Sequence, residues 1–271
     1  MKSFKRIYIE ITNCCNLSCS FCPSTKRERK FMSTYEFETI IKKLKGHGQY
    51  VYLHLQGEPM LHPNFLEILE ICNEYGMKVN LTTNGTLIEG KIDQMIKVKS
   101  LRQVSFSLQS QENMADTPIF MKYMTNILSM ISKGIKTSEI IFELRLWNYE
   151  DTISDDGFSK NNTALTMIKE SLNVSAETIE AIPMGKGSKL MPQVYLSKAV
   201  EFNWPDMKFD VIDCEGTCYG LRQQVGILVN GDVVPCCLDS NGDITLGNIY
   251  KDEFETIVTS ERATGIVEGF E

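Results

Sequence analysis

The sequence has no apolar run long enough to cross a membrane, no signal peptide and no excess of positive charge. Its 271 residues carry a formal net charge of -7, from 28 Lys and Arg residues against 35 Asp and Glu residues. A protein that binds the backbone of a nucleic acid polymer presents a basic surface, so the charge argues against that class. The N-terminus has basic residues but neither an apolar core segment nor a small-residue cleavage site. We therefore expect a cytoplasmic protein without a membrane partner, in which thiols stay reduced.

Repeats and low-complexity segments are also absent, whereas cysteine is plentiful. Four of the nine cysteines lie within nine positions near the N-terminus: Cys14, Cys15, Cys19 and Cys22. Four more lie toward the C-terminus: Cys214, Cys218, Cys236 and Cys237. Cysteines so close in sequence do not readily pair with each other, so their clustering favours metal binding over a disulfide framework. Cys72 stands alone on an apolar helical stripe, and we interpret it as a core residue.

Strands alternate with helices over the first 182 residues. The predicted strands span residues 6–11, 51–55, 77–85 (with the exit turn of that strand), 104–108, 140–146 and the stretch around 177–182. Six such strand–helix units predict parallel strands with helices outside. Apolar and polar residues alternate along these strands, whereas fully buried parallel strands are continuously apolar. The expected fold class is therefore α/β, an incomplete (β/α)6 parallel barrel with a polar cavity, and a half-exposed sheet is the alternative.

The remaining residues predict a linker and a small second module. Glycine and proline break the pattern over residues 183–213, which we interpret as a linker after a barrel domain at 1–182. Residues 214–271 then contain a hairpin, with the turn at Asn230-Gly231, and a terminal helix at about 250–259.

The first cysteine group has the spacing of a metal site. Cys15, Cys19 and Cys22 form C-x3-C-x2-C directly after the first predicted strand, at the end of a barrel strand where active-site loops lie. Three thiolates suit an iron–sulfur cluster better than zinc, which would need a fourth protein ligand. A [4Fe–4S] cluster held in this way keeps one iron open. Cys14 falls outside the spacing, so we interpret it as structural.

This motif, with the aromatic Phe21 before its last cysteine, resembles the signature of the radical S-adenosylmethionine (SAM) superfamily. The stretch Gln56-Gly57-Glu58-Pro59 is similar to the family's Gly-Gly-Glu-Pro element, with Gln56 in place of the first glycine, and residues 82–85 also match. The resemblance implies that Cys15, Cys19 and Cys22 are the catalytic cluster ligands. It also implies that the residues in contact with SAM include Phe21, Gln56, Gly57, Glu58, Asn84, Ser107, Gln109 and Arg145.

The resemblance also implies a reaction. The cluster passes one electron to SAM, and the resulting 5′-deoxyadenosyl radical takes a hydrogen atom from a substrate. An electron donor such as flavodoxin or ferredoxin is the implied protein partner.

The second cysteine group resembles the SPASM/twitch module of many radical SAM enzymes. The spacing is Cys218-x12-Gly231-x4-Cys236, followed by Cys237 and by Leu-Gly-Asn-Ile at 246–249. Full SPASM modules carry further cysteines downstream, and none follows Cys237 here. The resemblance therefore implies one auxiliary iron–sulfur cluster at most, with ligands from Cys214, Cys218, Cys236 and Cys237. A zinc site, or no metal, is the alternative.

The polar strand faces supply substrate candidates, namely Tyr8, Glu10, His54, Glu143 and Glu180. Each of these residues also fits a buried hydrogen-bond or ion-pair network. The compact length and the polar cavity favour a small-molecule substrate. The chain also resembles short radical SAM lyases of queuosine salvage, which cut a C–N bond of the 7-deazapurine base queuine. A peptide-modifying radical SAM enzyme and a zinc-stabilised binding module without catalysis are the alternatives.

Overall fold

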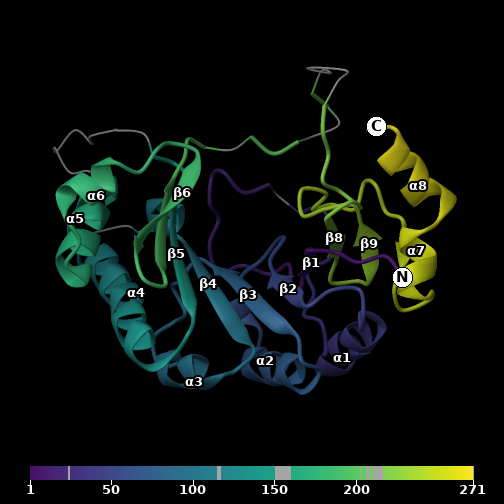
Figure 1. Ribbon diagram of the computed structural model, residues 1–271, viewed down its shortest axis with the longest axis horizontal. Helices are drawn as coiled ribbons and strands as arrows, with labels where there is room; N and C mark the ends of the chain where they lie inside the picture. Colours follow the sequence, from purple (N-terminus) through teal and green to yellow (C-terminus); the bar gives the residue numbers. More distant parts are fainter. Residues whose placement is uncertain are drawn as a thin grey trace. The chain divides into compact units, whose positions relative to one another are not determined.

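A computed structural model describes most of the chain (Figure 1). The described residues are 1–23, 25–114, 117–149, 160–201, 203–205, 208–209 and 216–270. The chain forms two compact units. The first unit comprises Met1–Asn16, Pro23–Leu81 and Trp204–Glu271, and the second comprises Leu17–Cys22 and Thr82–Asn203.

The strands of the first unit run in the order β10-β9-β8-β1-β2-β3. Their bounds are β1 Arg6–Ile9, β2 Tyr50–Leu53, β3 Lys78–Thr83, β8 Gln224–Ile227, β9 Asp232–Val234 and β10 Gly247–Asn248. β1 pairs in parallel with both β2 and β8, and β9 pairs antiparallel with β8. The predicted hairpin is therefore confirmed, with Gly231 at φ 88° in its turn. Because β8 pairs with β1, the hairpin of the C-terminal module extends the sheet of the N-terminal strands.

The helices of the first unit are α1 Thr34–Lys43, α2 Phe65–Glu74, α7 Phe254–Val258 and α8 Glu261–Glu268, with a 3-10 turn, η1, at Pro59–Leu61. α1 begins with a capping box, in which Glu36 N donates to Ser33 Oγ at 3.2 Å and Ser33 N donates to Glu36 Oε2 at 2.7 Å. α1 and α2 lie on the same side of their strands (Figure 1). Cys72 on α2 is fully buried, as expected of a core residue.

The strands of the second unit run in the order β4-β5-β7-β6. Their bounds are β4 Leu101–Ser107, β5 Ile141–Leu146, β6 Lys186–Met191 and β7 Val194–Lys198. β4, β5 and β7 are parallel, and β6 is an antiparallel edge strand. The helical segments are α3 Ile92–Lys97, η2 Leu108–Asn113, α4 Thr117–Thr137, α5 Lys160–Leu172 and α6 Ala176–Glu180.

The predicted alternation of polar and apolar side chains is present in both units. In the first unit, Tyr8 pairs laterally with Tyr52, which pairs with Asn80. In the second, Ser105 pairs laterally with Glu143. Residues in lateral register share one face of a sheet, so polar side chains form rows across neighbouring strands. The α/β class with parallel strands is confirmed. Among the described residues, no helix combines the length and apolarity needed to cross a bilayer.

Two predictions about the region after residue 176 are wrong. Residues 177–182 were expected to form a strand, but most of them belong to α6, because Ser175 caps that helix by accepting from Thr178 N at 3.2 Å. Glu180 is accordingly exposed on a helix rather than placed on a polar strand face. Residues 183–213 were expected to be a linker, but they contain β6 and β7, and β7 supplies the strand parallel to β5. The start of the C-terminal module at residue 214 stays a prediction.

Candidate functional site

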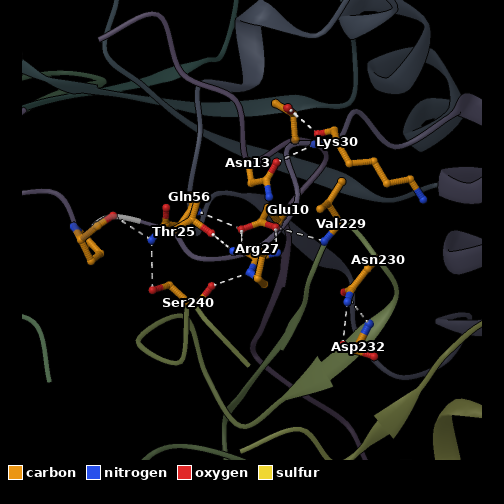
Figure 2. Close-up of polar contacts among 12 residues, drawn as sticks. Glu10, Asn13, Thr25, Arg27, Lys30, Gln56, Val229, Asn230, Asp232 and Ser240 are labelled. Atoms are coloured by element: carbon orange, nitrogen blue, oxygen red, sulfur yellow. Dashed lines mark hydrogen bonds and ion pairs between the residues drawn. The ribbon is translucent and has the colours of Figure 1, made fainter. Parts of the chain in front are cut away.

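Side chains just after β1 form hydrogen bonds that fix the segment leading into the first cysteine group. Thr12 Oγ1 donates to Lys30 O at 2.9 Å. Asn13 Nδ2 donates to Glu28 O at 2.8 Å. Asn13 Oδ1 accepts from Lys30 N, also at 2.8 Å (Figure 2). Both ends of the loop that contains the cysteines are therefore joined by side-chain hydrogen bonds.

The turn after β2 packs against the backbone immediately before Cys15. Gly57 has φ 75°, and a Cβ there would overlap Thr12 O and lie 2.8 Å from Cys14 O. Glu58 N donates to Cys14 O at 2.8 Å. Only glycine permits both this left-handed conformation and this approach of two backbones. The match to the Gly-Gly-Glu-Pro element thus corresponds to a turn that positions the half-buried Cys15.

Cys19 and Cys22 lie close together in the second unit. Cys22 N donates to Cys19 O at 3.2 Å, and the two thiols are hydrogen-bonded. This hydrogen bond, followed by burial, raises the pKa of Cys19. Without metal the Cys19 thiol is therefore protonated at neutral pH, and binding of a metal must release that proton. Phe21, between them, is partly buried.

Two residues that the sequence did not single out contact this segment. Asn113 Nδ2 donates to Cys19 Sγ at 3.1 Å. Glu112 accepts from Ser20 N at 2.6 Å and from Ser20 Oγ at 2.8 Å. Both residues end η2, which follows β4 directly. The signal that could have indicated them is their position, because they follow Ser107 and Gln109 at the carboxyl end of the same strand.

The predicted SAM residues on β4 and β5 include a charged pair. Ser107 and Arg145 are lateral neighbours. Arg145 donates from Nε and pairs through Nη2 with Glu143 Oε2, each at 2.8 Å. Its guanidinium also lies over the ring of Trp147, with Cζ 4.9 Å from the ring centroid. Ser105 Oγ donates to the same oxygen at 2.7 Å, so Oε2 of Glu143, a residue predicted to bind substrate, is already engaged by protein groups.

Two further predicted SAM residues differ in what their side chains contact. Asn84 Oδ1 accepts from Thr86 N at 2.9 Å and from Thr86 Oγ1 at 2.7 Å, so it stabilises its own turn. Gln109 is 6% exposed, and its Oε1 has no hydrogen-bond partner among the described residues. A buried acceptor left unsatisfied costs about 1–3 kcal/mol. The amino and hydroxyl groups of SAM are donors of the type that this oxygen needs, so Gln109 fits the cofactor.

The second cysteine group is divided by the structure. Cys218 and Cys236 interact electrostatically, and Cys218 Sγ accepts from Gly220 N at 3.3 Å. Cys237 also interacts electrostatically with Cys236, but its thiol forms a hydrogen bond with Tyr8, and burial raises the pKa of that thiol to about 11. Cys214 lies outside the described residues.

Tyr8 belongs to a small buried cluster rather than to an open polar wall. The cluster contains Leu55, Leu228 and Val234, with Cys237 packed against it. The Tyr8 ring centroid lies 6.0 Å from that of His54, which is half-buried. Burial raises the pKa of Tyr8. Its hydroxyl is therefore neutral and is engaged with a thiol.

Glu10 lies just beyond β1, and its side chain is fully buried. Arg27 binds it in a bidentate ion pair, with both N–O distances 2.7 Å. Val229 N donates to Glu10 Oε1 at 3.1 Å (Figure 2). The prediction that Glu10 binds substrate is not supported by this geometry, because protein groups already use both carboxylate oxygens.

The family model of the Radical SAM superfamily matches residues 9–151. The chain belongs to the radical SAM superfamily. Residues 218–269 match the SPASM model, which is described as an iron-sulfur cluster-binding domain. As a radical SAM protein it uses a [4Fe–4S] cluster and SAM, and the SPASM match implies an auxiliary iron–sulfur cluster.

This radical SAM protein is similar to several curated proteins over part of its length. It is 33% identical over 101 residues to the Fe-coproporphyrin III synthase of Methanosarcina barkeri, a match that covers 36% of this chain and 25% of that protein. It is 29% identical over 117 residues to the GTP 3′,8-cyclase of Chlorobaculum tepidum, which covers 42% of this chain and 35% of that protein. The chain thus spans less than half the length of these relatives.

Solved structures of other proteins share the fold. The structure of anSMEcpe with bound AdoMet and Kp18Cys peptide matches with a TM-score of 0.63 and 15% identity, over 98% of this chain and 83% of that chain. BtrN in complex with AdoMet and 2-DOIA matches with a TM-score of 0.54 and 16% identity, over 99% and 87%. Identities this low show the fold alone, which confirms the expected partial barrel with a C-terminal module.

Proposed function

We propose that this radical SAM protein cleaves SAM reductively and uses the 5′-deoxyadenosyl radical to abstract hydrogen from a small polar substrate. The observation that carries the proposal is the loop of Cys15, Cys19 and Cys22 within the matched region. Its soft donor set suits iron, and three thiolates keep one iron open for SAM. When bound, the cluster supplies the electron for SAM cleavage. Within the described residues, no three His, Cys, Asp or Glu side chains come together as a metal site, so the assignment rests on the donor set, its spacing and the family match.

The protein's own contribution is to hold SAM and to keep the thiols in place. The backbone of Gly57 and Glu58 is the candidate for the SAM amino group, and Gln109 Oε1 is a ready acceptor. Arg145 is the candidate for the SAM carboxylate. Its Nε and Nη2 are fixed by Glu143, and Nη1 has no partner among the described residues. This pairing holds the guanidinium in one orientation before a carboxylate arrives.

A nucleobase is the substrate class that we favour, with queuine and cleavage of its C–N bond as the specific candidate. The rows of hydrogen-bonding side chains on β4 and β5 suit a polar ring system. The name of the cyclase from Chlorobaculum tepidum places a guanine nucleotide as the substrate of that protein, and queuine presents a similar hydrogen-bonding edge. A peptide substrate is the second candidate, because a structure with the same fold, anSMEcpe, is bound to a peptide.

Anaerobic reconstitution with iron and sulfide, followed by measurement of 5′-deoxyadenosine, tests the proposal. We expect iron-dependent production of 5′-deoxyadenosine that is lost in Cys15→Ala and retained in Cys72→Ala, the matched control for thiol removal. Queuine and candidate peptides are then compared as stimulants of this production. Tight binding of zinc without iron would instead support a binding module without catalysis. Stimulation by a peptide alone would refute the nucleobase assignment.

A further inference from the structure

The side chain of Gln56 contacts two segments that are far apart in the sequence. Its Nε2 donates to Pro23 O at 3.1 Å and to Ser240 Oγ at 3.1 Å (Figure 2). Pro23 directly follows Cys22, and Ser240 lies three residues after Cys237 in the C-terminal module. Ser240 is itself 4% exposed, and both hydrogen bonds are partly buried. Gln56 therefore connects the exit of the cysteine loop to that module.

A buried ion pair strengthens the same connection. Arg27, on the return from the cysteine loop, binds Glu10 through both terminal nitrogens and donates from Nε to Ser240 O at 3.0 Å. Gln56 N also donates to Glu10 Oε2, at 3.3 Å. The Arg27 side chain is 14% exposed and that of Glu10 is 0% exposed. A bidentate pair at this depth is directional and screened little by solvent.

These contacts hold both ends of the cysteine loop against one turn. Before Cys15, Glu58 N donates to Cys14 O. After Cys22, Gln56 Nε2 donates to Pro23 O. The two donors are two residues apart, so a movement of this turn would displace both ends of the loop. Because Ser240 Oγ accepts a hydrogen bond from Gln56, this turn is also connected to the C-terminal module.

We propose that Gln56 is a positioning residue that sets the geometry of the Cys15–Cys22 loop from Ser240 of the C-terminal module. The inference rests on the proposed role of Cys15, Cys19 and Cys22 as cluster ligands. A glycine at position 56 would retain the backbone of the turn and lose both side-chain hydrogen bonds. The arrangement makes the cluster environment depend on a module that supplies none of the three thiols.

Gln56→Met and Ser240→Ala test the proposal, since the first keeps the length of the side chain and removes its donors. Hydrogen exchange of the cluster-free protein is followed by mass spectrometry in peptides that cover residues 10–16 and 23–30. We expect exchange there to rise about fivefold in Ser240→Ala, the factor for one lost hydrogen bond, and by more than that in Gln56→Met, which loses two. Hydrogen exchange in the double variant should be only slightly faster than in the more strongly affected single variant, because the two changes remove a shared hydrogen bond. Lys42→Ala, which breaks an exposed ion pair on α1, is the control.

The second readout is the EPR spectrum of the reduced, loaded protein, with and without SAM. We expect Gln56→Met to keep its iron and to show altered g values, whereas Lys42→Ala keeps the wild-type spectrum. Wild-type exchange and wild-type spectra in Gln56→Met would overturn the inference. Cys15→Ala distinguishes this failure from a failure of the proposed function. If that variant loses its cluster while Gln56→Met is unchanged, the positioning role alone is wrong, and if it keeps the cluster and its response to SAM, the ligand assignment is wrong.

Discussion

Replacement of Gly57 by alanine tests how the turn after β2 positions Cys15. Gly57 has φ 75°, a left-handed conformation that costs an L-residue about 1–2 kcal/mol. The added Cβ would also overlap Thr12 O and lie 2.8 Å from Cys14 O, so backbone must move. Overpacking of this kind costs about 1–3 kcal/mol. Together the two terms predict that Gly57→Ala lowers the free energy of unfolding by about 2–5 kcal/mol.

Gly76→Ala is the matched control. Gly76 has φ 69° in the same unit, but a Cβ there would have no atom within 4 Å. It therefore isolates the conformational term and should cost about 1–2 kcal/mol. Urea unfolding of the cluster-free proteins measures both values, and iron per chain after reconstitution measures the effect on the loop. We expect Gly57→Ala alone to lose iron, because Cys14 O directly precedes Cys15.

Equal destabilisation of the two glycine variants, with full iron in both, would refute the reasoning. The close approach of the two backbones would then make no difference to the free energy of unfolding. If Gly57→Ala were destabilised only slightly more than Gly76→Ala, but Gly57→Ala alone lost iron, the positioning role of the turn would still be supported.

Three further outcomes follow from the contacts of individual side chains. Asn113→Ala removes the donor to Cys19 Sγ, and because hydrogen bonds to cluster sulfurs raise the reduction potential, an EPR-monitored redox titration should give a more negative midpoint. Cys236→Ser should lower iron per chain whereas Cys237→Ser should not, since the Cys237 thiol faces Tyr8; equal iron loss in both would contradict this division. Burial lowers the pKa of His62, so the folded protein binds fewer protons than the unfolded chain and stability falls as pH drops below about 6.5. Urea midpoints at several pH values should show a smaller acid loss in His62→Gln, and an unchanged slope would argue against a buried neutral imidazole.

The elements that the sequence predicted well are those with strong local signals. The capping box of α1 and the Asn230-Gly231 hairpin each lie within a few residues of chain, and local chemistry decides them. The predicted strand at 177–182 failed because a helix cap at Ser175 outweighed a short apolar pattern. The sequence pattern did not predict β6 and β7, because the glycine and proline residues around them indicated a linker.

The candidate site divides in the same way. The spacing of Cys15, Cys19 and Cys22 is a property of one short segment, so the sequence alone indicated an iron-binding donor set. Arg27, Glu112 and Asn113 carry no motif, and their contacts come from segments that only folding brings together.

The sequence by itself determined the donor set, the strand pattern and the family to which they point. The tertiary structure decided which polar groups are already used. Glu10 and Glu143 were both substrate candidates, yet Arg27 pairs with both carboxylate oxygens of Glu10, and Arg145 pairs with Oε2 of Glu143. Whether a carboxylate is paired depends on which charges reach it when the chain folds, and burial makes that pairing strong enough to matter. Folding likewise brings the Cys237 thiol into a hydrogen bond with Tyr8, a contact that the spacing of the cysteines does not indicate.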